Sequence, residues 1–218
     1  MHALIPVKRF ARAKTRLAPH LSAASRARIA RLMAEHVLSE LAWIQDLRVT
    51  VVSSEPASDE LCQRYGCERL PDDDLGVGLN QVLTSALHHL QDAGATRVLV
   101  LHADLPRLKR SDVEQLARRY AGHSSTDPVV LVPDRHDQGT NAMICSLPLG
   151  FELQYGPGSF QRHQQVARAC GLRVEVRRIE SLSWDLDVIG DLADLPPPPA
   201  MAQDSRPPLV ADRKYFCR

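Results

Sequence analysis

A short apolar run that ends near a carboxylate does most to limit how this chain can fold. Residues 98–101 read Val-Leu-Val-Leu, which predicts a strand buried on both faces of a parallel sheet. Asp104 follows this run, and Pro106 prevents the strand from continuing. In open α/β sheets the ligand crevice lies beyond the carboxyl ends of the strands. Asp104 is therefore a candidate to hold a divalent cation against a phosphate, although an Asp that only closes a turn would look the same.

Strand-like and helix-like segments alternate along the rest of the sequence. We expect strands at residues 3–7, 48–53, 67–70, 98–101, 129–132, 141–145 and 173–179, and helices at 22–45, 58–65, 79–93, 111–120 and 158–169. Ser22 and Ser111 are candidate helix N-caps, and Gly66 is a candidate C-cap. The alternation predicts an α/β fold, a three-layer α/β/α sandwich, in one domain over residues 1–195. The proline-rich segment 196–218 is expected to be a loosely packed tail.

Charge is balanced over the whole chain but not along it. The net charge of +1 gives no indication of nucleic-acid binding. Residues 1–34 contain eight Lys and Arg and no acid, a local field that would suit a polyphosphate. Lys8, Lys14 and Arg16 lie in what we expect to be a flexible loop after the first strand, which could wrap a triphosphate. The remaining cations around residues 26–31 are expected to form a solvated helix face.

The five cysteines are odd in number and scattered, which indicates reduced thiols rather than a zinc site. No apolar run reaches 18 residues, and the first 20 residues lack the apolar core of a signal peptide. We therefore expect a cytoplasmic protein that has no membrane partner.

Two further acids, Asp185 and Asp187, flank Leu186 near the end of the expected domain. In an extended segment, residues i and i+2 face the same side, so the two carboxylates would converge. Two negative charges at such a short distance repel each other unless a cation lies between them. Together with Asp104, the two carboxylates would form an oxygen site that suits Mg²⁺, with Mn²⁺ as the second option. The alternative is a pair of ordinary surface acids.

Two glycine-containing loops carry groups that could bind an anion. Thr140 follows Gly139 and offers a hydroxyl. Gly156 and Ser159 lie where a helix begins, and the free N–H groups there make an anion site. Helix capping alone would also explain Ser159. We expect His163 to be structural rather than catalytic.

A third loop leads into a helix at Gly78 and Asn80. It could receive a nucleoside, although an ordinary tight turn would have the same composition.

Seven short motifs of these kinds occur in a fixed order over residues 1–195. They are Pro6-Val7-Lys8, Ala13-Lys14-Thr15-Arg16-Leu17, Gly78-Leu79-Asn80, Ala103-Asp104-Leu105-Pro106, Gly139-Thr140-Asn141, Tyr155-Gly156 with Ser159-Phe160 and His163, and Asp185-Leu186-Asp187. As an ordered set they make the chain resemble the 2-phospho-L-lactate guanylyltransferases of coenzyme F420 biosynthesis, a family that includes phosphoenolpyruvate and 3-phospho-D-glycerate guanylyltransferases.

The resemblance implies a nucleotide-diphospho-sugar transferase-like (Rossmann-like) fold. It implies an enzyme that joins GMP from GTP to a small phosphorylated carboxylic acid and releases pyrophosphate. It also implies metal ligation by Asp104, Asp185 and Asp187, and binding of the phosphorylated acid at Thr140, Gly156 and Ser159. We expect Lys8, Lys14, Arg16, Gly78 and Asn80 to contact GTP, with Asp104 and Lys14 as the catalytic pair. The identity of the phosphorylated acid and the oligomeric state stay open, with a homodimer as one option.

Two alternatives compete with this interpretation. Nucleotidyltransferases that act on sugar phosphates or on molybdopterin usually have a glycine-rich loop after the first strand, whereas residues 7–11 contain no glycine. A non-catalytic nucleotide or phosphoacid sensor would be expected to have lost its metal carboxylates, and all three are present. His102 and Arg107 depart from the family pattern and are expected to alter the rim of the site.

Overall fold

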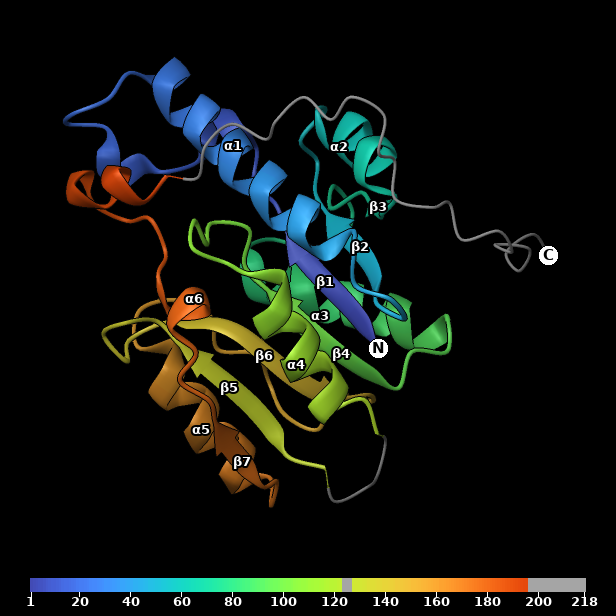
Figure 1. The fold of residues 1–218 in the computed structure, drawn as a ribbon. Helices are drawn as coiled ribbons and strands as arrows, with labels where there is room; N and C mark the ends of the chain where they lie inside the picture. The colour runs from blue at the N-terminus through green and yellow to red at the C-terminus, as the bar shows by residue number, and fades with distance from the viewer. Residues whose placement is uncertain (123–126, 196–218) are drawn as a thin grey trace.

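A mixed sheet runs through the molecule and carries helices on both faces (Figure 1). The computed structural model describes residues 1–122 and 127–195, so the expected tail at 196–218 lies outside the described residues. Within those residues the seven strands lie in the order β3-β2-β1-β4-β6-β5-β7. The expected α/β sandwich is thereby confirmed.

The boundaries of the elements lie close to those expected. The strands are β1 (His2–Pro6), β2 (Arg48–Val52), β3 (Glu68–Leu70), β4 (Arg97–Leu101), β5 (Val129–Pro133), β6 (Thr140–Ser146) and β7 (Val174–Val176). The helices are α1 (Ala23–Leu41), α2 (Ser58–Tyr65), α3 (Leu79–Asp92), α4 (Arg110–Arg119), α5 (Ser159–Ala169) and α6 (Glu180–Ser183). Three short 3₁₀ helices are η1 (Phe10–Arg12), η2 (Thr15–Leu17) and η3 (Ile189–Asp194).

The central strand β4 is buried on both faces, as its apolar run predicts, but its surroundings are not purely parallel. It pairs in parallel with β1, where Leu99 lies opposite Ala3. On its other side it pairs antiparallel with β6, where Leu99 lies opposite Ile144. The expectation of a parallel sheet on both sides is therefore wrong. The physical reason is that β6 returns directly from β5 through the short loop 134–139 and so runs against both of its neighbours.

Successive side chains of β4 point to opposite faces of the sheet and join two separate cores. Leu99 and Leu101 pack in one apolar cluster with residues of α1, α2, α4 and α6. Val98 and Val100 pack in the other cluster with residues of α3 and α5. The sheet is thus the middle layer of three, and both of its faces exclude water.

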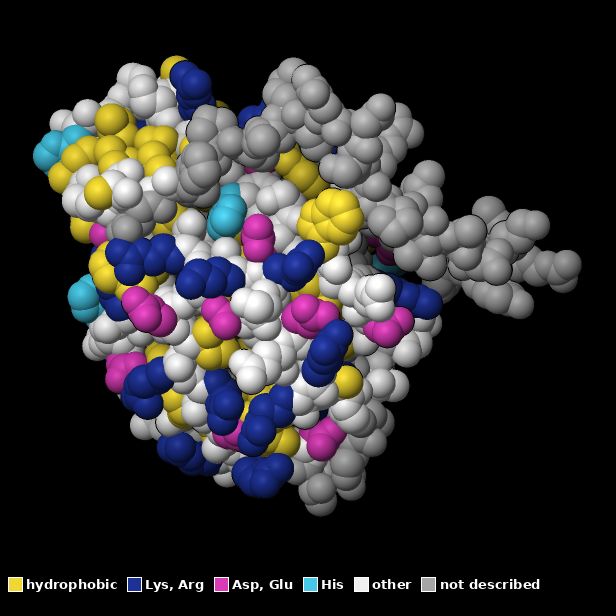
Figure 2. Space-filling view, in the orientation of Figure 1, with side chains coloured by type: hydrophobic (Ala, Val, Ile, Leu, Met, Phe, Trp, Pro, Cys, Tyr) yellow, Lys and Arg dark blue, Asp and Glu magenta, His cyan; other side chains and the backbone are white. Residues whose placement is uncertain are grey.

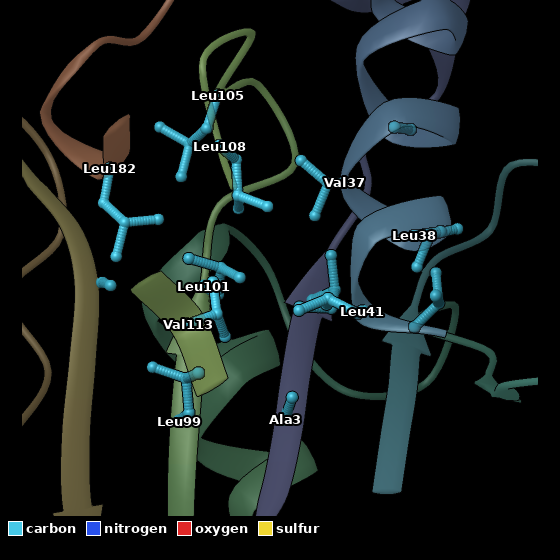
Figure 3. Close-up of a cluster of buried hydrophobic side chains, with 14 of the residues drawn as sticks. Ala3, Val37, Leu38, Leu41, Leu99, Leu101, Leu105, Leu108, Val113 and Leu182 are labelled. Carbon is cyan, nitrogen blue, oxygen red and sulfur yellow. The ribbon is translucent and has the colours of Figure 1, made fainter. Parts of the chain in front are cut away.

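The first of these clusters also fixes the chain just after β4 (Figure 3). Leu105 and Leu108 are almost fully buried and lie near Val37 of α1 and Leu182 of α6. Burying a leucine side chain contributes about 1.5–3 kcal/mol. The segment that bears Asp104 is therefore anchored by apolar packing, although it has no regular secondary structure.

Two of the three expected helix caps are present. The Ser22 hydroxyl accepts a hydrogen bond from the Ser25 N–H at the start of α1, and Gly66 ends α2 with φ +68°. The expected cap at Ser111 is wrong, because α4 begins one residue earlier, at Arg110. A carboxylate from α1, that of Glu40, accepts a hydrogen bond from the Arg110 N–H (2.7 Å) and takes over the capping role.

The basic connection after β1 differs from the flexible loop that we expected. It forms η1 and η2, and each is anchored by a buried apolar side chain, Phe10 in η1 and Leu17 in η2. Lys14, between them, has φ 52°. A left-handed backbone at a residue with a long side chain is uncommon, and here it turns the chain between the two short helices.

Basic and acidic side chains are interspersed on the face shown in Figure 2, without one continuous patch of a single sign. Within residues 1–122 and 127–195, no helix is both long enough and apolar enough to cross a lipid bilayer.

Candidate active site

A cavity of about 480 Å³ lies at the carboxyl ends of β1 and β4 and is called the first cavity below. It brings together most of the residues predicted from the sequence. Those that line it are Lys8, Lys14, Arg16, Asp104, Thr140, Gly156, Ser159, Asp185 and Asp187. Gly78 lines a smaller neighbouring cavity, the second cavity, of about 270 Å³. Asn80 is not among the described residues that line either cavity.

Six of the acids and cations that line the first cavity are called the charged side below; they are Lys8, Lys14, Arg16, Asp104, Asp185 and Asp187. Lys14 contacts two acids of this set. Its Nζ donates a hydrogen bond to Asp104 Oδ2 (2.6 Å) and another to the Leu186 carbonyl oxygen. The same Nζ lies 3.8 Å from Asp187 Oδ1. Because only 9% of its side chain is exposed, Lys14 is held as an internal counter-ion for the acids.

The two acids near the chain end are placed by the residue between them. Leu186 is fully buried in an apolar cluster with Leu17, and its N–H donates to the Asp104 carbonyl oxygen (3.2 Å). Asp185 and Asp187, on either side of it, line the first cavity. This is the alternation expected from the i, i+2 spacing, although the segment is not part of the sheet.

The segment after Asp187 is held by an acid that the sequence reasoning missed. Asp191 Oδ2 accepts hydrogen bonds from the N–H groups of Asp187 and Val188, both at 2.8 Å. Asp191 is buried and its other oxygen is 2.7 Å from the Arg135 guanidinium. The Asp187 carboxylate is also paired with the guanidinium of Arg16.

The protonation of the acids follows from burial and from their neighbours. Burial favours the neutral form of Asp104, but the adjacent Lys14 ammonium and His102 outweigh it and keep the pKa of Asp104 below its usual range. Burial, and then the charges of Asp104 and Asp187, raise the pKa of Asp185 to about 6. The three acids therefore carry more negative charge than Lys14 alone neutralises.

The chemistry of these donors fits a divalent cation. Three carboxylates line one cavity, and their mutual repulsion is what a hard cation would relieve. In the part of the chain that the structure describes, no set of three or more His, Cys, Asp and Glu side chains is placed so that it could hold a metal ion. The Lys14 ammonium lies against Asp104 instead.

The first cavity is also lined by two hydroxyls, those of Thr140 on β6 and Ser159 at the start of α5, called the hydroxyl pair below. Both residues are 2% exposed, and Ser159 Oγ lies 3.4 Å from Thr140 Oγ1. Ser159 does not cap the helix, because the N-cap of α5 is Gly158, with φ 71°. The capping alternative for Ser159 is therefore wrong.

His163 orients the hydroxyl pair. Its Nε2 accepts a hydrogen bond from the Gln154 N–H (2.8 Å), so in a neutral ring the proton is on Nδ1. Burial lowers the pKa of His163 to about 4, so the ring is neutral at pH 7. Nδ1–H lies 3.0 Å from Thr140 Oγ1 and donates to it, which leaves the Thr140 proton free to be donated to a ligand.

The loop before Thr140 is shaped by Asp134, a second residue that the sequence reasoning missed. Its carboxylate accepts hydrogen bonds from the N–H groups of His136 (2.9 Å), Gln138 (2.8 Å) and Gly139 (2.7 Å). A Cβ at Gly139 would lie 2.8 Å from the Asp134 carboxylate, which explains the glycine. An Asp that precedes a turn of this kind is a recognisable signal.

Asn80 connects α3 to the loop at Tyr155. Its side chain donates to the Tyr155 carbonyl oxygen (3.1 Å) and accepts from the Tyr155 N–H (2.7 Å). Gly156 follows with φ +126°, a conformation that favours glycine. The Asn80 amide thereby holds the loop that presents Gly156 and Ser159, and its predicted contact with a nucleotide stays a prediction.

The two residues that depart from the family pattern both lie near the acids. His102 lines the first cavity, and its Nδ1 is 4.0 Å from Asp104 Oδ1. The Arg107 guanidinium lies 3.7 Å from the centre of the Trp184 ring, next to Asp185 in the chain. His102 therefore lies beside Asp104, and Arg107 packs on the residue that precedes Asp185.

Solved structures similar to this one share its fold at low sequence identity. A candidate nucleotide-diphospho-sugar transferase from Desulfovibrio desulfuricans G20 matches with a TM-score of 0.67 and 19% identity, over 88% of this chain and 84% of that chain. Glucosyl-3-phosphoglycerate synthase from Mycobacterium tuberculosis, solved with Mn²⁺, uridine diphosphate and glucosyl-3-phosphoglycerate, matches with a TM-score of 0.53 and 12% identity, over 80% and 68% of the two chains.

Similarity in sequence is more specific. The chain is 38% identical to a phosphoenolpyruvate guanylyltransferase from Conexibacter woesei over 191 residues, 87% of this chain and 84% of that protein. It is 33% identical to a 2-phospho-L-lactate guanylyltransferase from Methanothermobacter thermautotrophicus over 196 residues, 88% and 82% of the two chains. The sequence profile of the family described as "Guanylyl transferase CofC like" matches residues 1–196. The chain therefore belongs to the CofC-like guanylyl transferase family and is a nucleotidyltransferase.

Proposed function

We propose that this guanylyltransferase joins GMP from GTP to the phosphate of a small phosphorylated carboxylic acid, as a step of coenzyme F420 biosynthesis. The acid is 2-phospho-L-lactate, phosphoenolpyruvate or 3-phospho-D-glycerate. The observation that carries the proposal is the construction of the first cavity, which is lined by three carboxylates, the Lys14 ammonium and the hydroxyl pair. The names of the relatives support the choice of substrates.

The charged side suits the triphosphate of GTP. Lys8, Lys14 and Arg16 line the cavity where β1 ends, so they can compensate several phosphate charges from one side. Arg16 is largely exposed, with 71% of its side chain in solvent. Lys14 is nearly buried and is the cation best placed to stabilise charge that develops during the reaction.

The hydroxyl pair suits the phosphorylated acid. The Thr140 proton is free because the Thr140 oxygen accepts from His163, and it also accepts from the Ser159 O–H, a weak bond at 3.4 Å that Ser159 can exchange for one to a ligand. At Gly156 a Cβ would lie 3.3 Å from the Arg162 guanidinium, so a side chain there would narrow the loop that faces the ligand. These neutral donors bind an anion and orient it without neutralising its nucleophilic oxygen.

Asp104, Asp185 and Asp187 are the residues that would hold Mg²⁺, or Mn²⁺ as in the solved synthase of similar fold. When bound, the cation would neutralise phosphate charge and orient the reacting phosphates. A cation held there would have to displace the Lys14 ammonium from the Asp104 carboxylate, because the ammonium donates to it and the described acids are not grouped around one point.

The reaction needs alignment more than acid–base chemistry. A phosphate oxygen of the acid attacks the α-phosphorus of GTP, a new P–O bond forms, and the bond to the β-phosphate oxygen breaks, so that pyrophosphate leaves with the electron pair. A phosphate monoester is mostly ionised at pH 7, so no strong general base is required. The task of the chain is then to hold two anions in line, and the hydroxyl pair and Lys14 are the groups that would hold them.

The proposal is tested by a product assay. The protein is incubated with GTP, Mg²⁺ and each of the three phosphorylated acids in turn. Pyrophosphate release is measured, and the GMP conjugate is identified by mass spectrometry. We expect stoichiometric pyrophosphate and conjugate with at least one acid, and none with GTP alone. Absence of a conjugate with all three acids would contradict the proposal.

A further inference from the structure

We propose that Asp72 selects guanine, by accepting two hydrogen bonds from the edge of the base in the second cavity. This inference rests on the proposed use of a nucleoside triphosphate and adds the residue that reads its base. It begins from an unexplained feature: Asp72 lines the second cavity, and its Oδ1 is buried with no hydrogen-bond partner in the described part of the chain. A buried carboxylate oxygen without a donor is costly, which indicates that a ligand supplies the donor.

The two cavities adjoin at the end of β1 and the start of α3. Pro6, Val7, Lys8 and Leu79 line both of them. A ligand whose phosphates lie among the cations of the first cavity can therefore extend past Lys8 into the second. Asp72 is among the residues that line this second cavity.

The second cavity has the surfaces that a flat heterocycle needs. Val7 and Val52 are almost fully buried and line one part of it, and Leu79 and Val82 of α3 line another. Apolar side chains of this kind pack on the faces of a base, while a few polar groups read its edge. Gly78, which also lines the cavity, has φ +87° and no atom within 4 Å of where a Cβ would lie, so the chain leaves room there.

The loop that carries Asp72 is held in place by α3. Gln81 Oε1 accepts a hydrogen bond from the Val77 N–H (2.8 Å), and Ser85 Oγ donates to the Leu75 carbonyl oxygen (2.8 Å). The Asp72 carbonyl oxygen accepts from the Leu75 N–H (3.2 Å). These bonds position the loop before a ligand arrives, which specific reading of a base requires.

The chemistry of the carboxylate then identifies the base. An ionised carboxylate only accepts hydrogen bonds, and it has two oxygens. Guanine presents two adjacent donors, N1–H and the C2 amino group. Adenine presents the lone pair of N1 beside its amino group, cytosine presents the lone pair of N3, and uracil presents a single N–H between two carbonyls. The two oxygens of Asp72 therefore match the two donors of guanine. They would meet a lone pair or a carbonyl oxygen of each other base, so selection combines attraction to guanine with repulsion of the alternatives.

The Asp72→Asn variant provides the sharpest test, because it replaces one acceptor by a donor of the same shape. The amide N–H₂ would meet the C2 amino group of guanine, whereas xanthine has a carbonyl oxygen there. We expect kcat/KM for GTP to fall at least about tenfold, the order expected for a bidentate contact to a base, and activity with XTP to rise. Asp74→Asn, in the same loop but exposed and outside both cavities, is the matched control and should retain the preference for GTP.

Binding measured by calorimetry separates this inference from the proposed reaction. Affinities for GTP, ITP, ATP and XTP are measured in the unmutated protein and in the two variants, without a phosphorylated acid. ITP lacks the C2 amino group, so we expect it to bind several-fold more weakly than GTP, and ATP more weakly still; this comparison needs no variant to fold. If the protein binds GTP selectively but forms no conjugate, the proposed function fails and the inference stands. If ATP or ITP binds as tightly as GTP, or if Asp72→Asn keeps the original preference, the inference is overturned.

Discussion

The acids and cations of the charged side of the first cavity are carried by loops and by η2, and all but Lys14 are partly or largely exposed, whereas the hydroxyl pair is carried by β6 and α5 and is almost fully buried. Asp187 has 36% of its side chain exposed, and Thr140 only 2%. The charged side is held by ion pairs among its own members. The hydroxyl pair is held by His163, whose two nitrogens are both hydrogen-bonded to protein groups.

This difference implies a division of labour between the two sides. Ion pairs such as Lys14–Asp104 can exchange partners when phosphates or a cation arrive, because each charge gains an equivalent partner. Hydrogen bonds in the buried network cannot be exchanged without leaving a buried polar group unpaired. We therefore expect the charged side to rearrange when ligands bind and the hydroxyl pair to stay as it is. Variants of the acids should mainly lower kcat, variants of the cations should mainly weaken GTP binding, and variants of the hydroxyl pair should mainly raise the KM for the phosphorylated acid.

The largest effect is expected for Asp104→Asn. Removing this charge takes away a counter-charge for Lys14 and a candidate ligand of the cation, so kcat should fall at least ~100-fold, the order found when one electrostatic stabiliser is lost. The measurement is pyrophosphate release at saturating GTP, phosphorylated acid and Mg²⁺. Full activity of the variant under these conditions would show that Asp104 is not a metal ligand. It would also contradict the expectation that the acids of the charged side determine kcat.

A second effect concerns stability and tests whether His163 is neutral. The pKa of His163 in the folded protein is about 4, below its value of about 6.5 in the unfolded chain. Its contribution to stability is therefore fully present above pH 6.5 and is lost as the pH falls from 6.5 toward 4. Linkage gives a loss of roughly 2–3 kcal/mol between pH 7.5 and pH 4.5.

This loss is measured by urea unfolding of the ligand-free protein at both pH values, with His163→Asn as the reference. The variant should lose less stability than the unmutated protein over this range, because it lacks the titrating group. Equal losses in the two proteins would mean that the pKa of His163 is the same in the folded and the unfolded chain, and that burial does not keep the ring neutral below pH 6.5.

The third effect is on the KM for the phosphorylated acid. Ser159→Ala removes a hydroxyl that would donate to an anion, a bond worth roughly 1.5–3 kcal/mol, so this KM should rise about tenfold or more. The KM for GTP should change much less. The melting temperature of the same variant is the control, because Ser159 does not cap α5. A lower melting temperature with an unchanged KM would leave Ser159 a purely structural role.

The smallest effect on GTP binding is expected for Arg16→Ala. Comparing it with Lys14→Ala shows whether the exposed or the nearly buried cation contributes more to binding of the triphosphate. Arg16→Ala removes an exposed ion pair and should raise the KM for GTP less than about fivefold. Lys14→Ala removes a nearly buried cation and should weaken GTP binding about tenfold. Both variants should affect the phosphorylated acid less than GTP. Equal affinities for both ligands in Lys14→Ala and the unmutated protein would contradict a role in triphosphate binding.

Much of the fold follows from local patterns in the sequence. The apolar run of β4, the cap at Ser22 and the glycine that ends α2 depend on neighbouring residues alone, and the structure confirms each of them. The direction of β6 could not be predicted in this way. Antiparallel and parallel pairing use the same apolar residues, and only the short connection from β5 decides between them.

The candidate site also has features that follow from local sequence and features that depend on contacts between distant segments. The sequence by itself determined which acids, cations and hydroxyls are available and that Asp185 and Asp187 share one side, because residue spacing fixes the direction of side chains. Only the tertiary structure decided that Lys14 lies against Asp104, 90 residues away in the chain, and that His163 leaves the proton of Thr140 free. Contacts between distant segments depend on how the layers pack, and no local pattern encodes them.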